Sequence, residues 1–469
     1  MPVSVAEPVG DPAGSRRFVK GHRSRSGERA DIRSRSCPRV RCADSGRRLR
    51  AIRPVGEAAI PGTFLWLNPL HERRSMRNTT TGPGVRIAVR RAISALLVAG
   101  CAVPVAGVAA ADPVASSGPG TIVSSRSLEA TELIPAAGEG YRLVYRTTGR
   151  DGEPAISGGN VYLPAGAAPP GGWRVVSWAH GTSGMAQGCA PNLLGGIADT
   201  HDETPQLTDL LAQGYAVVAT DYIGLGAPGR YEYLSGRAEG HAVLDIVRAG
   251  RLVEPELSDS YALAGHSIGG HAVLHAAQLS SSYAPELDLR GTAAFAPTSN
   301  YEQLISALSG PDLAVPFPAG LQLRVLMILA GLDHAHPELG VADHLSERGK
   351  HVVAIAESGE DCLRSAEQAL TGRPFGQLFA EPLSDPALTA ALREYMAAPT
   401  TGYDRPLLLL QGGADTVQPI PTTVLLQQRL EQSGTDSRLL VYPAADHFTL
   451  LPHARHDTAA FLAHMLPSR

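Results

Sequence analysis

Short apolar segments alternate with amphipathic segments along the chain from residue 173 onward. Four apolar segments are each followed closely by Gly, Asp or His, and they span residues 173–179, 216–220, 261–264 and 407–410. Helical patterns such as residues 236–253 and 271–279 separate them. Apolar strands that alternate with helices are typical of a mostly parallel β-sheet covered on both faces. The pattern predicts an α/β fold, in which the chemistry lies at the carboxyl ends of the strands.

A different pattern precedes the first of these strands. Residues 141–147 and 155–163 have strand character and flank the turn Arg150-Asp151-Gly152. The pattern predicts an antiparallel hairpin at an edge of the sheet.

The strand–helix alternation is interrupted between the strand-like residues 291–295 and Leu407. The intervening residues look mostly helical, with an apolar segment at 320–332 and an amphipathic segment at 384–397 that has Ser384 at its expected N-cap. We interpret residues 298–402 as an inserted helical cap, which divides the core domain into residues 112–297 and 403–469. A pair of core helices belonging to the main domain is the alternative.

The N-terminal residues 1–75 are rich in Arg, Ser, Gly and Pro and have neither helical nor strand periodicity. We interpret them as disordered or as an over-extended reading frame. A basic arm that binds nucleic acid or an anionic membrane is the alternative.

An export signal follows this segment. Four arginines between residues 77 and 91 precede the apolar run 92–111, which ends in Ala109-Ala110-Ala111. We predict that residues 76–111 are a signal peptide cleaved before Asp112, so that the protein is secreted. A membrane anchor is disfavoured because the run is weakly apolar. Acylation of Cys101 at a lipoprotein-like box and a twin-Arg signal at Arg90-Arg91 are variants of the same export, and the apolar residues after Cys101 disfavour the first.

Charge and cysteines both change on the carboxyl side of this signal. The first 91 residues hold 20 basic and 7 acidic side chains, whereas the rest holds 21 and 38. The acidic remainder excludes nucleic acid as a partner of the main domain, since phosphates are bound by clustered Lys and Arg. Cleavage would leave Cys189 and Cys362, and an oxidising compartment predicts one disulfide between them. Two buried free thiols are the alternative.

The motif Gly265-His266-Ser267-Ile268-Gly269 follows the apolar strand 261–264 and opens the helical segment 271–279. A serine on so sharp a strand-to-helix turn needs small neighbours, and its hydroxyl then projects from the sheet. We therefore predict Ser267 as the nucleophile of a serine hydrolase with the α/β-hydrolase fold.

A serine nucleophile needs a base and a group that orients the base, in the chain order Ser, acid, His on this fold. Asp415 lies in the loop after strand 407–410, and His447 follows the strand-like residues 437–442. These two residues are the predicted acid and base. Asp446 is the alternative acid, but adjacent residues on a strand-end turn seldom face each other.

An oxyanion hole needs two backbone N–H donors. The amide of Ile268, directly after the nucleophile, is the first. The second is expected in the loop His180-Gly181-Thr182-Ser183-Gly184, where Thr182 is the first candidate and Gly181 the next. His180 is expected to hold the loop without transferring protons.

Taken together, these motifs resemble the secretory lipase family of α/β-hydrolases over residues 120–469. The likeness lies in His180-Gly181-Thr182, Cys189-Ala190-Pro191-Asn192, the run from Thr220 to Gly226, the serine motif, Asp415 and His447. It implies hydrolysis of carboxylic esters, often acylglycerols, by an enzyme with a helical cap before the strand that carries the acid. It also supports the Cys189–Cys362 disulfide. The chain departs from some fungal members, which have an acidic side chain where Gly181-Thr182 stand.

The predicted reaction is acyl transfer through an acyl-serine, without cofactor or metal. The expected partner is a lipid or small ester, with transient contact to a lipid interface, and the expected state is a monomer. A peptidase of the same fold and a catalytically silent binding module are the rival functions.

Three further groups of residues are weaker candidates. His271 and His275 have metal-ligand spacing but lack the Glu of a His-Glu-x-x-His motif, so a packed helix face is favoured. The run Asp333-His334-Ala335-His336 is interpreted as a polar helix end rather than a metal site. Asp221 shapes a strand-end loop, where contact with substrate and a role in the turn stay open.

Overall fold

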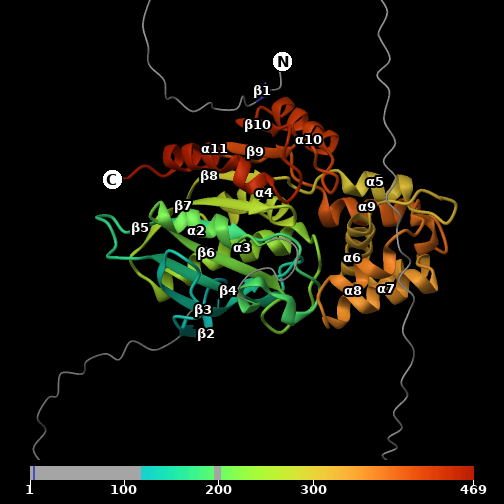
Figure 1. Ribbon diagram of the computed structural model, residues 1–469. Coiled ribbons are helices and arrows are strands. Elements are labelled where there is room, and N and C mark those ends of the chain that lie inside the picture. Colours follow the sequence, from blue (N-terminus) through green and yellow to red (C-terminus); the bar gives the residue numbers. More distant parts are fainter. Residues whose placement is uncertain (1–3, 6–117, 195–201, 469) are drawn as a thin grey trace, which may run out of the picture. The chain divides into compact units, whose positions relative to one another are not determined.

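A mixed β-sheet forms the centre of the protein in the computed structural model, which describes residues 4–5, 118–194 and 202–468 (Figure 1). The strand order is β1-β10-β9-β8-β7-β5-β6-β4-β3-β2. The strands are β1 (Ser4–Val5), β2 (Ile122–Ser127), β3 (Ala137–Thr148), β4 (Pro154–Pro164), β5 (Trp173–Ala179), β6 (Tyr215–Ile223), β7 (Leu257–His266), β8 (Asp288–Phe295), β9 (Leu407–Gly412) and β10 (Ser437–Tyr442).

The pairing of the strands matches the two patterns seen in the sequence. Strands β5 to β10 pair in parallel, and β1 pairs in parallel with β10. The predicted hairpin is present as β3 and β4, with β2 pairing antiparallel outside it. The mostly parallel sheet confirms the predicted α/β fold.

Helices cover both faces of the sheet, and a buried apolar cluster fills each interface. The cluster on one face contains Val175 of β5 with side chains of α3, α4 and α10, while the other contains Val176 with side chains of α2 and α11. Adjacent strand residues point to opposite faces, so a continuous apolar strand serves both clusters. These helices, with the short α1, are α1 (Pro191–Leu194), α2 (Thr204–Ala212), α3 (Gly236–Val253), α4 (Ile268–Tyr283), α10 (Ile420–Gln432) and α11 (Leu450–Met465).

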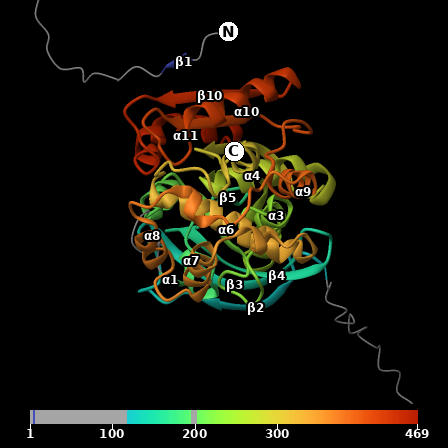
Figure 2. The ribbon, with the colours of Figure 1, turned by 90° about the vertical axis from the view of Figure 1, so that its right-hand side faces the viewer.

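Five helices lie between β8 and β9 and gather at one end of the sheet (Figure 1), where Figure 2 shows α6 crossing in front of it. They are α5 (Tyr301–Leu308), α6 (Ala319–Ala335), α7 (Glu347–Ser358), α8 (Arg364–Leu370) and α9 (Pro386–Met396), with 3₁₀ turns η2 (Pro337–Leu339), η3 (Val341–His344) and η4 (Phe375–Leu378). Their buried side chains belong to the same apolar cluster as those of α3 and α4. The helical content matches the predicted insertion, and its limits at 298 and 402 stay a prediction.

The start of α9 corrects one expectation. Asp385, not Ser384, is the N-cap, because its carboxylate accepts hydrogen bonds from the amides of Ala387 and Leu388. Pro386 occupies the first helical position, where its missing N–H costs nothing.

The expectations for the N-terminus concern residues that the structure does not describe, apart from β1. The disordered or over-extended segment 1–75 and the signal peptide 76–111 therefore stay predictions. Within residues 118–194 and 202–468, the structure contains no helix long and apolar enough to span a bilayer.

Candidate active site

Ser267 occupies a strained turn between β7 and α4. Its backbone angles are φ 59° and ψ −117°, a conformation that is costly for a residue with a side chain. The turn is possible because its neighbours are glycines: a Cβ on Gly269 would lie 1.9 Å from the carbonyl oxygen of Ala179, and one on Gly265 would lie 2.4 Å from that of Gly269. The side chain of Ser267 is thereby directed toward the loop that follows β10.

The structure brings Ser267, His447 and Asp415 together at the carboxyl ends of β7, β10 and β9. The Nε2 atom of His447 lies 3.0 Å from Ser267 Oγ, and its Nδ1 atom lies 2.8 Å from Asp415 Oδ2. An ionised carboxylate only accepts hydrogen bonds, so Nδ1 carries the proton and Nε2 is free to accept one from the serine hydroxyl. This is the arrangement that general-base activation of a serine requires.

Backbone amides fix the position of the carboxylate. Asp415 Oδ1 accepts hydrogen bonds from the amides of Val417 at 2.8 Å and Gln418 at 2.7 Å. Its other oxygen faces His447 and the side chain of Gln411. The carboxylate therefore has a defined orientation, with one oxygen committed to the turn and the other to the imidazole.

Asp446 has a different role in the same loop. Its Oδ1 accepts hydrogen bonds from the amides of Phe448 and Thr449 and from the Thr449 hydroxyl. These bonds, led by the one from the hydroxyl, lower the pKa of the exposed Asp446 carboxyl. The residue closes the turn before α11 and does not contact the imidazole nitrogens of His447 through any hydrogen bond among the described residues, which matches its interpretation as a loop acid.

Burial controls the ionisation of the imidazole. Only 2% of His447 is exposed. Desolvation lowers its pKa to about 4, and the hydrogen bond with Asp415 opposes that shift. With this pKa, His447 is neutral at neutral pH and is able to act as a base.

The low pKa of His447 predicts a pH dependence of turnover. A general base works in its unprotonated form, so activity is present above its pKa and is lost as pH falls through it. We expect kcat/KM for a soluble nitrophenyl ester to fall on the acid side with a midpoint at about pH 4. Circular dichroism at each pH separates this titration from acid unfolding, and a midpoint near 6.5 with the fold intact would contradict the prediction.

The three candidate residues of the oxyanion hole differ in whether their backbone amides are free to donate a hydrogen bond. Ile268 is the first residue of α4, where an amide has no partner within the helix. The Gly181 amide donates a hydrogen bond to Glu203 Oε1 at 3.0 Å and is thus occupied. The Thr182 amide makes no hydrogen bond to another residue among those described, and the Thr182 hydroxyl is held by Tyr233. The geometry favours Thr182 over Gly181 as the second donor.

His180 holds this loop from inside, as the sequence suggested. Its Nδ1 lies 2.6 Å from the carbonyl oxygen of Gly181, and its ring packs against Tyr222. The Tyr222 hydroxyl donates to the carbonyl oxygen of His180 at 2.8 Å. No hydrogen bond joins His180 to Ser267 or His447 among the described residues.

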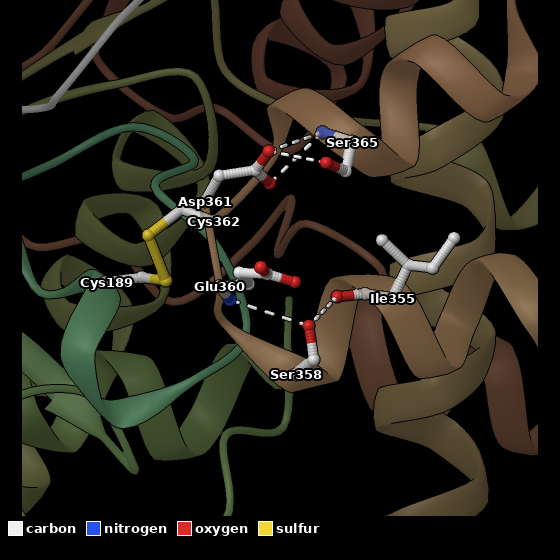
Figure 3. Close-up of a disulfide and its surroundings, with 7 residues drawn as sticks. All are labelled: Cys189, Ile355, Ser358, Glu360, Asp361, Cys362 and Ser365. Carbon is white, nitrogen blue, oxygen red and sulfur yellow. Dashed lines mark hydrogen bonds between the residues drawn. A yellow bond between two sulfur atoms is a disulfide. The ribbon is translucent and has the colours of Figure 1, made fainter. Parts of the chain in front are cut away.

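The predicted disulfide between Cys189 and Cys362 is present (Figure 3). It joins the 3₁₀ turn η1 (Gln187–Cys189) after the oxyanion loop to the connection between α7 and α8, where the Asp361 carboxylate accepts hydrogen bonds from the amide and the hydroxyl of Ser365. The bond packs directly on the loop, since a Cβ on Gly184 would lie 2.8 Å from Cys189 Sγ. The disulfide thus fastens the helical insertion to the segment that contains Thr182.

Removing this disulfide is expected to lower stability strongly. The two cysteines are 173 residues apart, and closing so long a loop restricts the unfolded chain. We expect the double variant Cys189→Ala/Cys362→Ala to lose about 2–5 kcal/mol of unfolding free energy, measured by urea denaturation. Wild-type protein in dithiothreitol is the control and is expected to converge on the same midpoint. An unchanged midpoint in both samples would contradict the prediction.

The buried Asp221 has a structural role. It forms an ion pair with the buried Arg142 and accepts a hydrogen bond from Asn192 Nδ2 at 2.8 Å. Arg142 also donates to the carbonyl oxygen of Gly226. The pair therefore shapes the loop after β6, which decides the open question about Asp221 in favour of the turn.

The histidine pairs also fulfil structural roles. His271 Nε2 donates to the carbonyl oxygen of Met396 at the end of α9, and the ring of His275 packs against that of His271 with the centroids 4.5 Å apart. His334 and His336 pair with Glu357 and Glu338. No group of three or more His, Cys, Asp or Glu side chains among the described residues is arranged to hold a metal ion.

Two side chains that contact the candidate active site could not be identified from the sequence. Glu203 contacts the oxyanion loop through Gly181 N, and His266 contacts the main chain of His447. His266 was a variable position of the serine motif, and Glu203 belonged to no motif at all. Their contacts depend on how distant segments meet in the fold.

Known proteins resemble this chain in fold and in part of the sequence. A family model described as secretory lipase matches residues 194–457. A probable inactive lipase of Mycobacterium tuberculosis is 29% identical over 286 residues, which cover 57% of this chain and 60% of the relative. A secreted triacylglycerol lipase of Malassezia globosa is 28% identical over 347 residues, which cover 70% and 73%. The closed-state crystal structure of Candida antarctica lipase A has the same fold, with a TM-score of 0.61, 23% identity and coverage of 74% and 82%.

Proposed function

The chain belongs to the secretory lipase family and has the α/β-hydrolase fold, and we propose that it is an active esterase that hydrolyses lipid carboxylic esters. One relative is named a probable inactive lipase, so the proposal needs support from this chain itself. That support is the unbroken hydrogen-bond chain from Ser267 through His447 to Asp415.

In the proposed acylation step, Ser267 Oγ attacks the ester carbonyl carbon while His447 Nε2 takes the hydroxyl proton. The negative charge on the carbonyl oxygen is stabilised by the amides of Ile268 and Thr182, and each such donor is typically worth about 10²–10³ in rate. The C–O bond then breaks, and His447 returns the proton to the leaving alcohol. Asp415 keeps the imidazole in the required tautomer and stabilises its protonated form.

Water completes the proposed reaction. His447 removes a proton from a water molecule, which attacks the acyl carbon, and the tetrahedral intermediate expels Ser267 as it regains its proton. The products are a carboxylic acid and an alcohol. All proton transfers use one imidazole, and the proposed reaction does not call on a metal or an organic cofactor.

The reaction class is tested with a fluorophosphonate probe and two substrate series. We expect the purified protein to be labelled at Ser267 and to turn over nitrophenyl esters much faster than aminoacyl amides. Faster cleavage of the amides would favour the peptidase alternative. Absence of both labelling and turnover would favour a silent binding module.

Burial of the site predicts dependence on a lipid interface. Ser267 and His447 are each 2% exposed, and α6 and α9 pack close by: Gly331 of α6 contacts Tyr233, and the hydroxyl of Tyr395 on α9 donates to the Tyr233 carbonyl. We therefore expect substrate entry to involve movement of the helical insertion, and contact with lipid would stabilise an open arrangement that exposes apolar surface. We expect the rate on tributyrin to rise steeply once substrate exceeds its solubility limit. A smooth saturation curve through that limit would contradict this prediction.

Export is the remaining part of the proposal. The family is named for secretion, and the Cys189–Cys362 disulfide suits an oxidising compartment. We propose that residues 76–111 direct the chain out of the cell. N-terminal sequencing of the secreted protein is expected to begin at Asp112.

A further inference from the structure

Glu203 is a buried carboxylate that the proposed reaction does not use. It lies at the start of α2 and is 4% exposed. Its Oε2 accepts a hydrogen bond from Trp178 Nε1 at 2.9 Å, and its Oε1 accepts one from the Gly181 amide and faces His266 Nδ1, each at 3.0 Å. Burying a carboxylate is costly unless it is well hydrogen-bonded. These contacts satisfy it, and two of them belong to segments that form the candidate active site.

His266 connects this carboxylate to the proposed base. Its Nε2 lies 3.0 Å from the carbonyl oxygen of His447, and the two imidazole rings are 4.7 Å apart. A carbonyl oxygen only accepts hydrogen bonds, so Nε2 carries a proton. His266 is also the residue before Ser267, and its ring thus lies between the nucleophile turn and the loop of His447.

The contacts also determine how many protons the pair holds. His266 Nδ1 faces a carboxyl oxygen, and one proton must lie between Nδ1 and Glu203 Oε1 for a hydrogen bond to exist. Whichever atom holds this proton, Glu203 and His266 together have no net charge. A neutral pair can be buried beside His447 at far smaller cost than a single charge.

We propose that Glu203 and His266 are positioning residues that hold the oxyanion loop and the base in register with the nucleophile. This inference rests on the proposed function. Glu203 binds the residue before Thr182 directly, and through His266 it reaches the main chain of His447. One carboxyl group therefore ties together three segments that are distant in sequence and that must align to within a fraction of an ångström for acyl transfer.

An amide cannot replace this carboxyl group. Trp178 Nε1 and the Gly181 amide are both donors, and they address different oxygens of Glu203. In Glu203→Gln the amino group must face one of these two donors, whichever way the side chain is flipped. The variant therefore loses the hydrogen bond with Trp178 or the one with Gly181, although the side chain keeps its size.

Two substitutions of His266 separate the two halves of the link. His266→Asn places an amide nitrogen near the position of Nδ1, so it keeps the bond to Glu203 and loses the one to His447. His266→Gln reaches the position of Nε2, so it keeps the bond to the His447 carbonyl and loses the one to Glu203. Both variants leave the hydrogen bonds of Glu203 to Trp178 and Gly181 available, which favours folding.

The test measures kcat and KM separately on a soluble nitrophenyl butyrate, together with the thermal unfolding midpoint. We expect Glu203→Gln and His266→Asn each to lower kcat roughly 10- to 100-fold with KM changed less than about twofold, because misplaced groups slow the chemical step. We expect His266→Gln to retain more activity than His266→Asn. The double variant Glu203→Gln/His266→Asn is expected to lose no more than the worse single variant, since both belong to one link.

Asp245→Asn is the matched control for loss of a buried carboxylate. Asp245 lies on α3 and accepts hydrogen bonds from Thr147, Tyr283 and Arg248, which are not part of the candidate site. It is expected to lower the unfolding midpoint while leaving kcat near the wild-type value.

Several results would overturn the positioning role. A Glu203→Gln variant that loses stability like the control but keeps wild-type kcat would reduce Glu203 to a structural residue. Losses that multiply in the double variant, or wild-type kcat in both His266 variants, would show that the residues do not act as one link. Failure of the proposed function is distinguishable, because the wild-type protein itself would then show neither ester turnover nor fluorophosphonate labelling.

Discussion

Replacing Ser267 with Ala is expected to lower kcat for ester hydrolysis by about 10⁶-fold, the size of loss seen when a serine nucleophile is removed from a triad. The substitution deletes the oxygen that forms the acyl-enzyme, and a neighbouring hydroxyl cannot replace it in the position 3.0 Å from His447 Nε2. Alanine fits the space of serine, so the fold is expected to persist. Rates are measured on nitrophenyl butyrate, and labelling by the fluorophosphonate is expected to disappear.

Ser280→Ala is the matched control for this experiment. Ser280 lies on the same helix, α4, is also buried, and its hydroxyl donates to the carbonyl oxygen of Ala277. This variant is expected to keep wild-type kcat and labelling. Wild-type turnover in Ser267→Ala would assign the nucleophile to a different residue, and equal losses in both variants would indicate damage to α4 instead.

The fold was predictable where the sequence shows both a hydrophobic periodicity and residues such as Gly that end a helix or strand. The helix expected over residues 236–253 is α3 with the same bounds, and the apolar run 261–264 lies within the strand β7. Capping choices were less predictable, because Ser384 and Asp385 are adjacent and both are good N-caps. The structure selects Asp385, which is followed by Pro386 in the first helical position.

Some residues of the candidate site could be predicted from the sequence, and others could not. Ser267, Asp415 and His447 could be selected because parallel strands bring their carboxyl ends to one edge, so the loops after them must meet. Glu203 could not be selected, since its contact with Gly181 depends on where the start of α2 lies against the oxyanion loop. The same contact removes Gly181 as a free donor, which the residue types alone could not reveal.

Replacing Asp415 with Asn is expected to lower kcat by about 10⁴-fold while the fold is retained. The reason lies in the two amides that address Asp415 Oδ1. They require an acceptor, so the carboxamide oxygen of Asn occupies that position and its amino group faces His447 Nδ1. Nδ1 must then accept this hydrogen bond, the proton moves to Nε2, and the imidazole can no longer take a proton from Ser267.

Asp446→Asn provides the comparison that identifies the acid. Asp446 is adjacent to His447 in sequence, yet its Oδ1 accepts bonds from Phe448 and Thr449, and the oxygen of an Asn can accept the same bonds. We expect its kcat to stay within a few-fold of wild type, measured on the same ester as for Asp415→Asn. Because both variants remove one carboxylate near the same imidazole, a general loss of negative charge would slow them alike. A large loss in Asp446→Asn with activity retained in Asp415→Asn would reverse the assignment of the acid.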